Sequence, residues 1–164
     1  MTRSGLQKTW IRILLTCLTV AVMVLIFSFS TEPAERSDQT SGQLSMTVIS
    51  VIHPDYETYT PVKKEEVYAD VQHYVRKAAH FTEYMMLGLL LRLCLESWFG
   101  RKRFLGPASW AAGALYACTD ELHQIRTDGR SGQFTDVLLD SCGVLAGVLL
   151  GVLLLRMLER RGKR

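Results

Sequence analysis

Four apolar stretches dominate this sequence, and each is long enough, or nearly so, to cross a lipid bilayer as a helix. About 20 predominantly apolar residues are needed to span a hydrocarbon core of about 30 Å. The third stretch is the shortest and has Gly106 and Pro107 near its start. Because 48% of the 164 residues are hydrophobic and only 21% are charged, residues 1–164 are predicted to form a single membrane domain. The predicted spans are residues 10–29, 78–99, 104–119 and 137–155.

The distribution of basic residues predicts which side of the membrane each span end faces. Lys and Arg are enriched in cytoplasmic segments of membrane proteins. Basic residues precede the first stretch, follow the last, and stand between the second and third as Arg101, Lys102 and Arg103. If all four stretches cross, all of these groups are cytoplasmic, whereas three crossings would place the basic C-terminal tail outside. We therefore predict four spans with both termini in the cytoplasm.

The first span also has features of a secretory signal peptide, because Ser28 and Ser30 flank a plausible cleavage point. Its apolar core after Arg12 is about 17 residues, which is longer than the core of most signal peptides. We therefore predict an uncleaved anchor. Cleavage would leave the topology of the other spans unchanged.

The segment between the first two spans, residues 31–77, is the only sizeable part predicted to lie outside the bilayer. Its polar residues 31–43 predict a loop. Residues 44–52 are apolar but too few to span, and they predict either an interfacial helix or a re-entrant lid on the outer leaflet. From Pro61, apolar residues recur every three or four positions, so a helix is expected to run directly into the second span. The predicted fold is all-α, a polytopic membrane protein with four transmembrane helices and an outer amphipathic helix.

Two classes of site are disfavoured by the residue types present. Cys17, Cys94, Cys118 and Cys142 all fall within predicted spans, and their spacing matches neither a zinc site nor a disulfide framework. We expect buried, inert thiols. The net charge of +3 comes from basic groups that the topology already explains, so we expect no nucleic-acid partner.

Ionisable residues gather at the span ends that are predicted to face outward, beginning with His80 and Glu83 on the second span. Ionisable groups at a membrane boundary are costly, so a function is the default interpretation. His80 and Glu83 are one helical turn apart, and Tyr84 extends the same stripe. Such a pair can bind a metal, or the carboxylate can orient the imidazole for proton transfer. The alternative is a buried polar pair that only ties helices together.

The third span ends in a dense polar run that contains two carboxylates and an imidazole: Asp120, Glu121, His123 and Gln124. If the helix continues past its apolar part, Tyr116, Asp120 and either His123 or Gln124 share one face. The alternative is a solvated helix end with ordinary polar residues.

On the fourth span, Asp136 and Asp140 are one turn apart, and Gly143, Gly147 and Gly151 continue the same face. Glycine at every fourth position allows a neighbouring helix to approach closely, so this face is predicted to point into the bundle. Asp140 should therefore point inward as well, because a carboxylate facing lipid would cost about 3 kcal/mol.

Three basic residues are candidates to balance these carboxylates: Lys77, Arg126 and Arg130. The Gly-containing loop 128–132 predicts tight turns that would bring Arg130 back over the site. Arg130 could hold a phosphate or carboxylate group, or serve only as a counter-ion to the surrounding acids.

Apart from Arg12 near the start of the first span, the inner halves of the spans offer only Arg92 and Glu96 as charged residues. We predict that they form a snorkelling pair near the cytoplasmic end with no functional role. A proton-coupled transporter needs polar groups near the bilayer midplane, so this class fits the sequence less well.

The predicted topology brings the polar clusters to one depth in the outer third of the bundle, within about 10 Å of one another. Carboxylates so close together cannot all stay ionised without a cation, whether Arg, protonated His or a divalent metal. The candidate catalytic residues are His80, Glu83, Asp120, Glu121 and His123. The candidate substrate-binding residues are Lys77, Tyr84, Tyr116, Gln124, Arg130, Asp136 and Asp140.

The identity and order of these residues resemble the VanZ-like family of bacterial membrane proteins. The matching segments are Arg76-Lys77-Ala78-Ala79-His80-Phe81-Thr82-Glu83-Tyr84 with Leu87-Gly88, Tyr116-Ala117, Asp120-Glu121-Leu122-His123-Gln124, Arg130-Ser131-Gly132, Asp136-Val137, Asp140 and Gly143, and earlier Phe29-Ser30, Ser41 and Ser45. The resemblance implies a small helical protein of the bacterial cytoplasmic membrane. The family takes its name from a member associated with low-level resistance to teicoplanin, a glycopeptide with a lipid tail.

The expected function is that of a cell-envelope protein whose outward-facing His/Glu/Asp pocket binds, or acts on, a lipid-linked or amphiphilic molecule. The lipid bilayer is its other expected partner, and a link to glycopeptide resistance follows from the resemblance. In the enzyme alternative, a hydrolase or transferase would use His80 or His123 as general base or metal ligand. A proton-coupled transporter is the second alternative.

Overall fold

The computed structural model describes residues 3–31, 34–125 and 133–162, and within them the chain is helical with short connections and no strand. The elements are α1 (Arg3–Ser30), α2 (Ala34–Ile52), the short 3-10 helix η1 (Tyr56–Thr58), α3 (Pro61–Phe99), α4 (Leu105–Gln124) and α5 (Phe134–Gly162). The all-α fold class is confirmed. The helix predicted to begin at Pro61 and continue into the second span is also confirmed, as α3.

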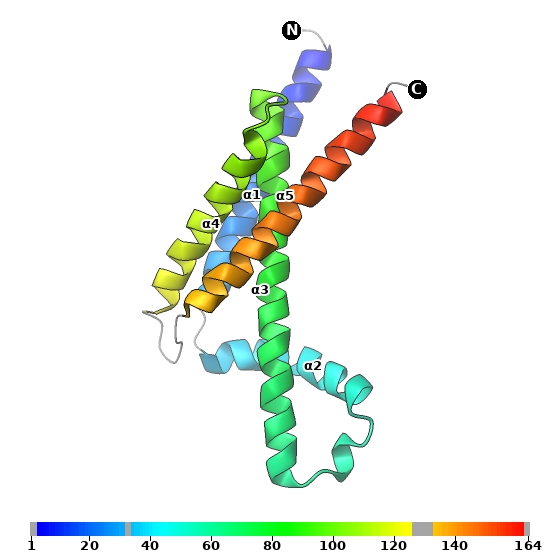
Figure 1. Ribbon diagram of the computed structural model, residues 1–164, viewed down its shortest axis with the longest axis vertical. Helices are drawn as coiled ribbons and strands as arrows, with labels where there is room; N and C mark the ends of the chain where they lie inside the picture. Colours follow the sequence, from blue (N-terminus) through cyan, green and yellow to red (C-terminus); the bar gives the residue numbers. More distant parts are fainter. Residues whose placement is uncertain (1–2, 32–33, 126–132, 163–164) are drawn as a thin grey trace.

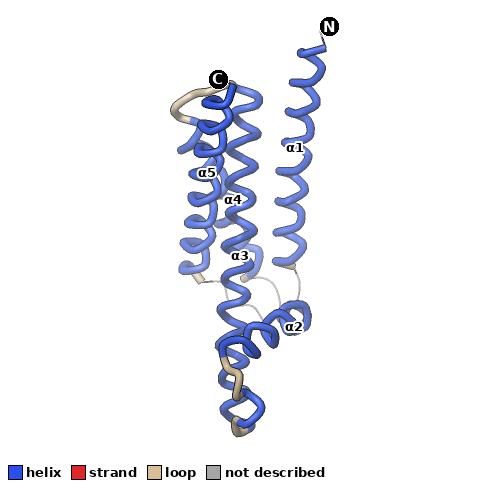
Figure 2. Tube along the Cα trace, turned by 90° about the vertical axis from the view of Figure 1, so that its right-hand side faces the viewer, coloured by secondary structure: helices blue, strands red, loops and turns tan. Residues whose placement is uncertain are grey.

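Helices α1, α3, α4 and α5 lie side by side as a bundle, with both chain ends at the same end of it (Figure 1). Helix α3 contacts each of the other α-helices and is the centre of the fold. We call the end of the bundle opposite the termini the distal end; it is formed where α1 stops at Ser30, α4 stops at Gln124 and α5 begins at Phe134. At 1.5 Å per residue, the 39 residues of α3 measure about 58 Å, so α3 continues well past the distal end (Figure 2).

Three of the described helices are long and apolar enough to cross a membrane: Lys8–Ser30, Pro61–Phe99 and Phe134–Arg161. Their exposed surfaces carry large apolar side chains such as Val24 and Leu153, as expected of helices that face lipid. The chain is therefore a polytopic membrane protein. Helix α4 does not belong to this set, although its 20 residues lie alongside the other bundle helices in Figure 1. Its crossing stays a prediction.

Helices α3 and α5 approach closely because glycines line their contact. A Cβ atom added at Gly143 would lie 2.6 Å from the carbonyl oxygen of Phe81, and one at Gly147 would overlap the α3 backbone. Gly151 makes room for the side chain of Arg92. The prediction that the glycine face of the fourth span points into the bundle is confirmed.

A small core fills the middle of the bundle, with side chains from each of its four helices. Its buried members are Ile26, Tyr84, Leu87, Ala117, Val144 and Val148. The prediction of buried cysteines is wrong for Cys17, Cys118 and Cys142, which lie on the outside of the bundle. Hydropathy marked their helices as spans but carried no information on which face would pack.

Helix α2 lies across the distal end of the bundle and packs on α3 (Figure 1). The loop predicted for residues 31–43 is wrong from Ala34 onward, where α2 begins. The apolar residues 44–52 form the second half of that helix, where Ser45 and Ile49 are buried. Packing of this half stabilises a helix that then extends into the polar residues before it, because elongating a helix costs less than nucleating one.

Candidate functional site

The distal end of the bundle holds a buried polar cluster made by α3, α4 and α5. Asp120 and Asp140 are 3% and 2% exposed, and Tyr84 is completely buried. Glu121 and Gln124 are also buried. Lys77, His80, Glu83, His123 and Asp136 are half-buried. The cluster thus has a buried base and a less buried rim.

Asp120 is held by a hydrogen-bond network that joins α4 to α1. The Ser30 hydroxyl donates to Asp120 Oδ2 at 2.7 Å. Gln124 Nε2 donates to the same carboxylate oxygen at 3.0 Å and to Ser30 Oγ at 3.1 Å. Of the two residues that could share a face with Asp120, the structure thus pairs Gln124 with it. All three side chains are buried, so each bond forms away from water.

Ser30 is a member of the cluster that was not among the candidate site residues, although Phe29-Ser30 is one of the segments that carry the family resemblance. It ends α1 and is completely buried, although its position at the end of an apolar span suggested only an exit from the membrane. A serine at the end of an apolar span was the only local signal available. Its partner on α4 is 90 positions away, so the pairing depends on how the helices are assembled.

Glu121 ties the end of α4 to the start of α5. Its Oε1 accepts the backbone N–H of Gln133, the residue before α5, at 2.6 Å. A carboxylate beside a helix N-terminus satisfies an unpaired donor and interacts favourably with the helix dipole. This geometry gives Glu121 a clear structural role.

Lys77 pairs with Asp136 across the rim of the cluster, with Nζ 2.5 Å from Oδ1. Both side chains are about one-third exposed, which makes this an ion pair at the boundary of the cluster. Of the three basic candidates, Lys77 therefore has an acidic partner in the structure. Arg126 and Arg130, with the turns predicted around them, lie outside the described residues.

Asp140 is the centre of the acidic group. Its Oδ1 atom is buried and has no hydrogen-bond partner among the described residues. It interacts electrostatically with Asp120, Glu121, Asp136 and Glu83, so acids from all three helices belong to one group. Close carboxylates repel one another, and the group needs compensation by protons or by a cation.

The aromatic and imidazole candidates differ in which part of the protein they contact. Tyr84 lies close enough to Asp120 and Asp140 to interact electrostatically with both. The Tyr116 hydroxyl donates to the Met23 carbonyl of α1 at 2.6 Å, which fixes it as a contact between helices. The His123 ring packs on Phe27 of α1, with ring centroids 4.8 Å apart. His123 therefore faces α1.

No metal site is formed by the described part of the chain: no group of three or more His, Cys, Asp or Glu side chains there is arranged to hold an ion. The buried carboxylates lie on α4 and α5: Asp120 accepts from Ser30 and Gln124, and Glu121 accepts from the backbone of Gln133. The half-buried Asp136 pairs with Lys77.

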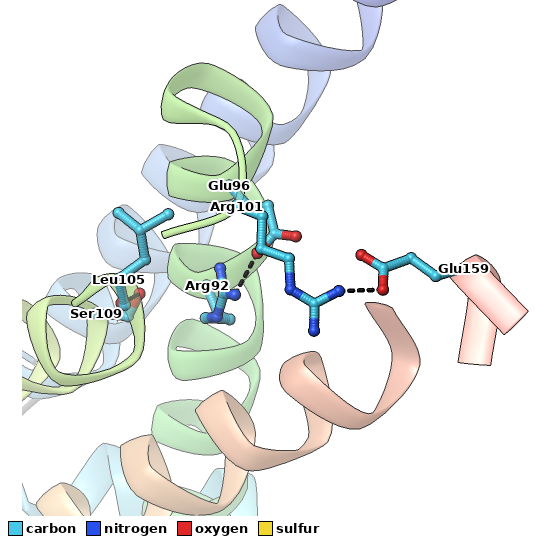
Figure 3. Close-up of polar contacts among 6 residues, drawn as sticks. All are labelled: Arg92, Glu96, Arg101, Leu105, Ser109 and Glu159. Atoms are coloured by element: carbon cyan, nitrogen blue, oxygen red, sulfur yellow. Dashed lines mark hydrogen bonds and ion pairs between the residues drawn. The ribbon is translucent and has the colours of Figure 1, made fainter. Parts of the chain in front are cut away.

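A second polar cluster lies at the opposite end of the bundle (Figure 3). Arg92 Nη2 donates to Glu96, and Arg101 of the loop that follows α3 pairs with Glu159 of α5. Arg92 is 5% exposed, and its Nε and Nη1 atoms have no partner among the described residues. The predicted pairing of Arg92 with Glu96 is confirmed. The prediction that Arg92 snorkels is wrong, because Gly151 leaves space for the arginine side chain inside the bundle.

Comparison with known protein families identifies this chain's family. A family model described as VanZ/LLP1 matches residues 15–156, which covers α1 from Leu15 to most of α5. No curated protein and no solved structure matches the chain.

Proposed function

The chain belongs to the VanZ/LLP1 family, and from this we propose that it is a cell-envelope protein that binds a lipid-linked or amphiphilic molecule at the outer leaflet. In this proposal the distal end of the bundle faces the outside of the cell. Binding would lower the sensitivity of the cell to glycopeptides with a lipid tail.

One observation carries the proposal: acidic side chains from α3, α4 and α5 form a single electrostatic group at one end of the bundle. Ionisable groups inside a membrane protein are expensive to keep, and as a rule they mark functional sites. The base of the group is buried, and its rim, with Lys77, Glu83 and Asp136, is half-buried. A headgroup at the leaflet surface would meet the rim first, while its acyl chain stayed in lipid.

Binding is favoured over hydrolysis or group transfer by the placement of His123, one of the two histidines that could act as a base. The His123 ring packs on Phe27 of α1, with the ring centroids 4.8 Å apart. His80 and Glu83 on one face of α3 keep an enzyme as the second candidate, with His80 as base. A transporter is less well supported, because the middle of the bundle is filled by apolar side chains such as Leu87 and Val148.

The proposal is tested in a strain that lacks the native gene and carries wild type, Asp140→Asn or Glu83→Gln. Glu159→Gln is the matched control, because it removes an acid that is well exposed at the other end of the bundle. Inhibitory concentrations are measured for teicoplanin and for a glycopeptide without a lipid tail, together with the protein level in membranes.

Wild type and Glu159→Gln are expected to raise the inhibitory concentration of teicoplanin only. Asp140→Asn and Glu83→Gln are expected to lose this effect at normal protein levels, and purified variants in nanodiscs should bind less of the drug. Full protection by both variants at normal protein levels would show that the acids are only structural. Turnover of an envelope lipid by wild type that Glu83→Gln abolishes would favour the enzyme.

A further inference from the structure

Helix α2 presents three different faces along its second half. One face is buried on α3 through Ser45 and Ile49. A second face is polar and exposed, and consists of Gln43, Thr47 and Ser50. The third face is apolar, and its residues follow the spacing of one helical stripe: Leu44, Val48, Val51 and Ile52.

The apolar face is largely uncovered by the described part of the protein. Val51 is 78% exposed, Ile52 60% and Leu44 56%. A stripe of aliphatic side chains left in water would be unfavourable, and exposed apolar patches on membrane-associated helices mark surfaces that meet a partner. The polar face next to it is suited to contact with water, whereas the apolar face is not.

The position of α2 identifies the partner. Trp and Tyr side chains are enriched at the two headgroup levels of a membrane protein. Trp10 and Trp98 stand at the terminal end of the bundle, and the apolar helices α1 and α5 end and begin at the distal end, at Ser30 and Phe134. Helix α2 lies across the bundle just beyond the distal end, and both views place it there (Figures 1 and 2).

We infer that α2 is an interfacial helix whose face formed by Leu44, Val48, Val51 and Ile52 binds the lipid surface at the distal end of the bundle. Interfacial helices bury such a face about 5–10 Å below the headgroups while lying in the plane of the membrane. Helix α1, with Phe27 and Phe29 exposed near its end, stops at Ser30, shortly before α2 begins at Ala34. This inference is independent of the proposed function.

The test uses the full-length chain with its four cysteines changed to serine and one cysteine added back at a time for a nitroxide label. Val51→Cys and Leu44→Cys report on the apolar face, and Ser50→Cys and Gln43→Cys are controls on the polar face of the same helix. All four positions are exposed, so the label does not disturb the contact with α3. The protein is placed in nanodiscs of phosphatidylglycerol and phosphatidylethanolamine.

Collisions of each label with oxygen, which enters lipid, are compared with collisions with a water-soluble nickel chelate. The oxygen-to-nickel ratio is expected to be several-fold higher at Val51 and Leu44 than at Ser50 and Gln43. Equal ratios at Val51 and Ser50 would overturn the inference, because both faces would then be in water. Spin–spin broadening at Val51 that disappears on dilution with unlabelled protein would also overturn it, since a second copy would cover the face.

Discussion

At the residue scale, Ser30 shows how one small side chain can join two helices that are distant in sequence. Its hydroxyl donates to Asp120 and accepts from Gln124, and all three groups are buried. Ser30→Ala is expected to lower the free energy of unfolding by about 1–3 kcal/mol, because a buried carboxylate oxygen loses a donor. Denaturation with SDS in mixed micelles measures this change.

Ser28→Ala is the matched control, since the Ser28 hydroxyl bonds only to the Val24 carbonyl of its own helix and is exposed. Its effect is expected to stay within about 0.5 kcal/mol. Equal stabilities for the two variants would mean that the bond between Ser30 and Asp120 contributes nothing, and that the burial of Asp120 is stabilised by other groups.

The residue scale also shows where sequence reasoning stops. Tracing the ionisable residues to span ends was possible from the sequence, because apolar length and charge are local properties. Whether Arg92 turns to solvent or into the bundle depends on Gly151, which lies on another helix. In the same way, His123 faces α1 and Gln124 faces Asp120, although both were compatible with the helix face defined by Tyr116.

At the element scale, the contact between α3 and α5 depends on the absence of side chains. Gly147→Ala is expected to destabilise the protein by about 1–3 kcal/mol, because the new Cβ would overlap the backbone of Met85 and force the helices apart. The same unfolding assay reports the change. Gly106→Ala is the control, because nothing lies within 4 Å of its Cβ position in α4.

Gly106→Ala should be neutral or stabilise the protein by up to about 1 kcal/mol, since alanine restricts the unfolded chain. If Gly147→Ala were tolerated as well as Gly106→Ala, the close approach of α3 and α5 would not be a determinant of stability.

The helices also differ in how well the local sequence predicts them. The continuous helix from Pro61 into the second span follows from periodicity alone, and the structure confirms it. Helix α2 was predicted only over its apolar half, because residues 34–43 carry loop-forming types and their helical state depends on the neighbouring half that packs on α3.

At the scale of the whole molecule, the arrangement of the helices relative to the membrane depends on α4. Helix α3 is long and apolar enough to span, so the η1 region and the loop after α3 should lie on opposite sides. Helix α4 falls outside the set of candidate spans, yet the basic C-terminal tail argues that it crosses. The side on which residue 131 emerges distinguishes the two arrangements.

We predict that α4 crosses and that both termini are cytoplasmic. In a cysteine-free background, Glu57→Cys and Ser131→Cys should react with a membrane-impermeant thiol reagent in intact cells, because both would lie outside. Lys102→Cys should react only after lysis. Labelling of Ser131→Cys only after lysis, with Glu57→Cys labelled in intact cells, would mean that α4 does not cross. The start of α5, which follows residue 131, would then be cytoplasmic while the start of α3 is outside. The acids of α3 and α5 could not share one end of the bundle, and the proposed site for outer-leaflet molecules would be ruled out.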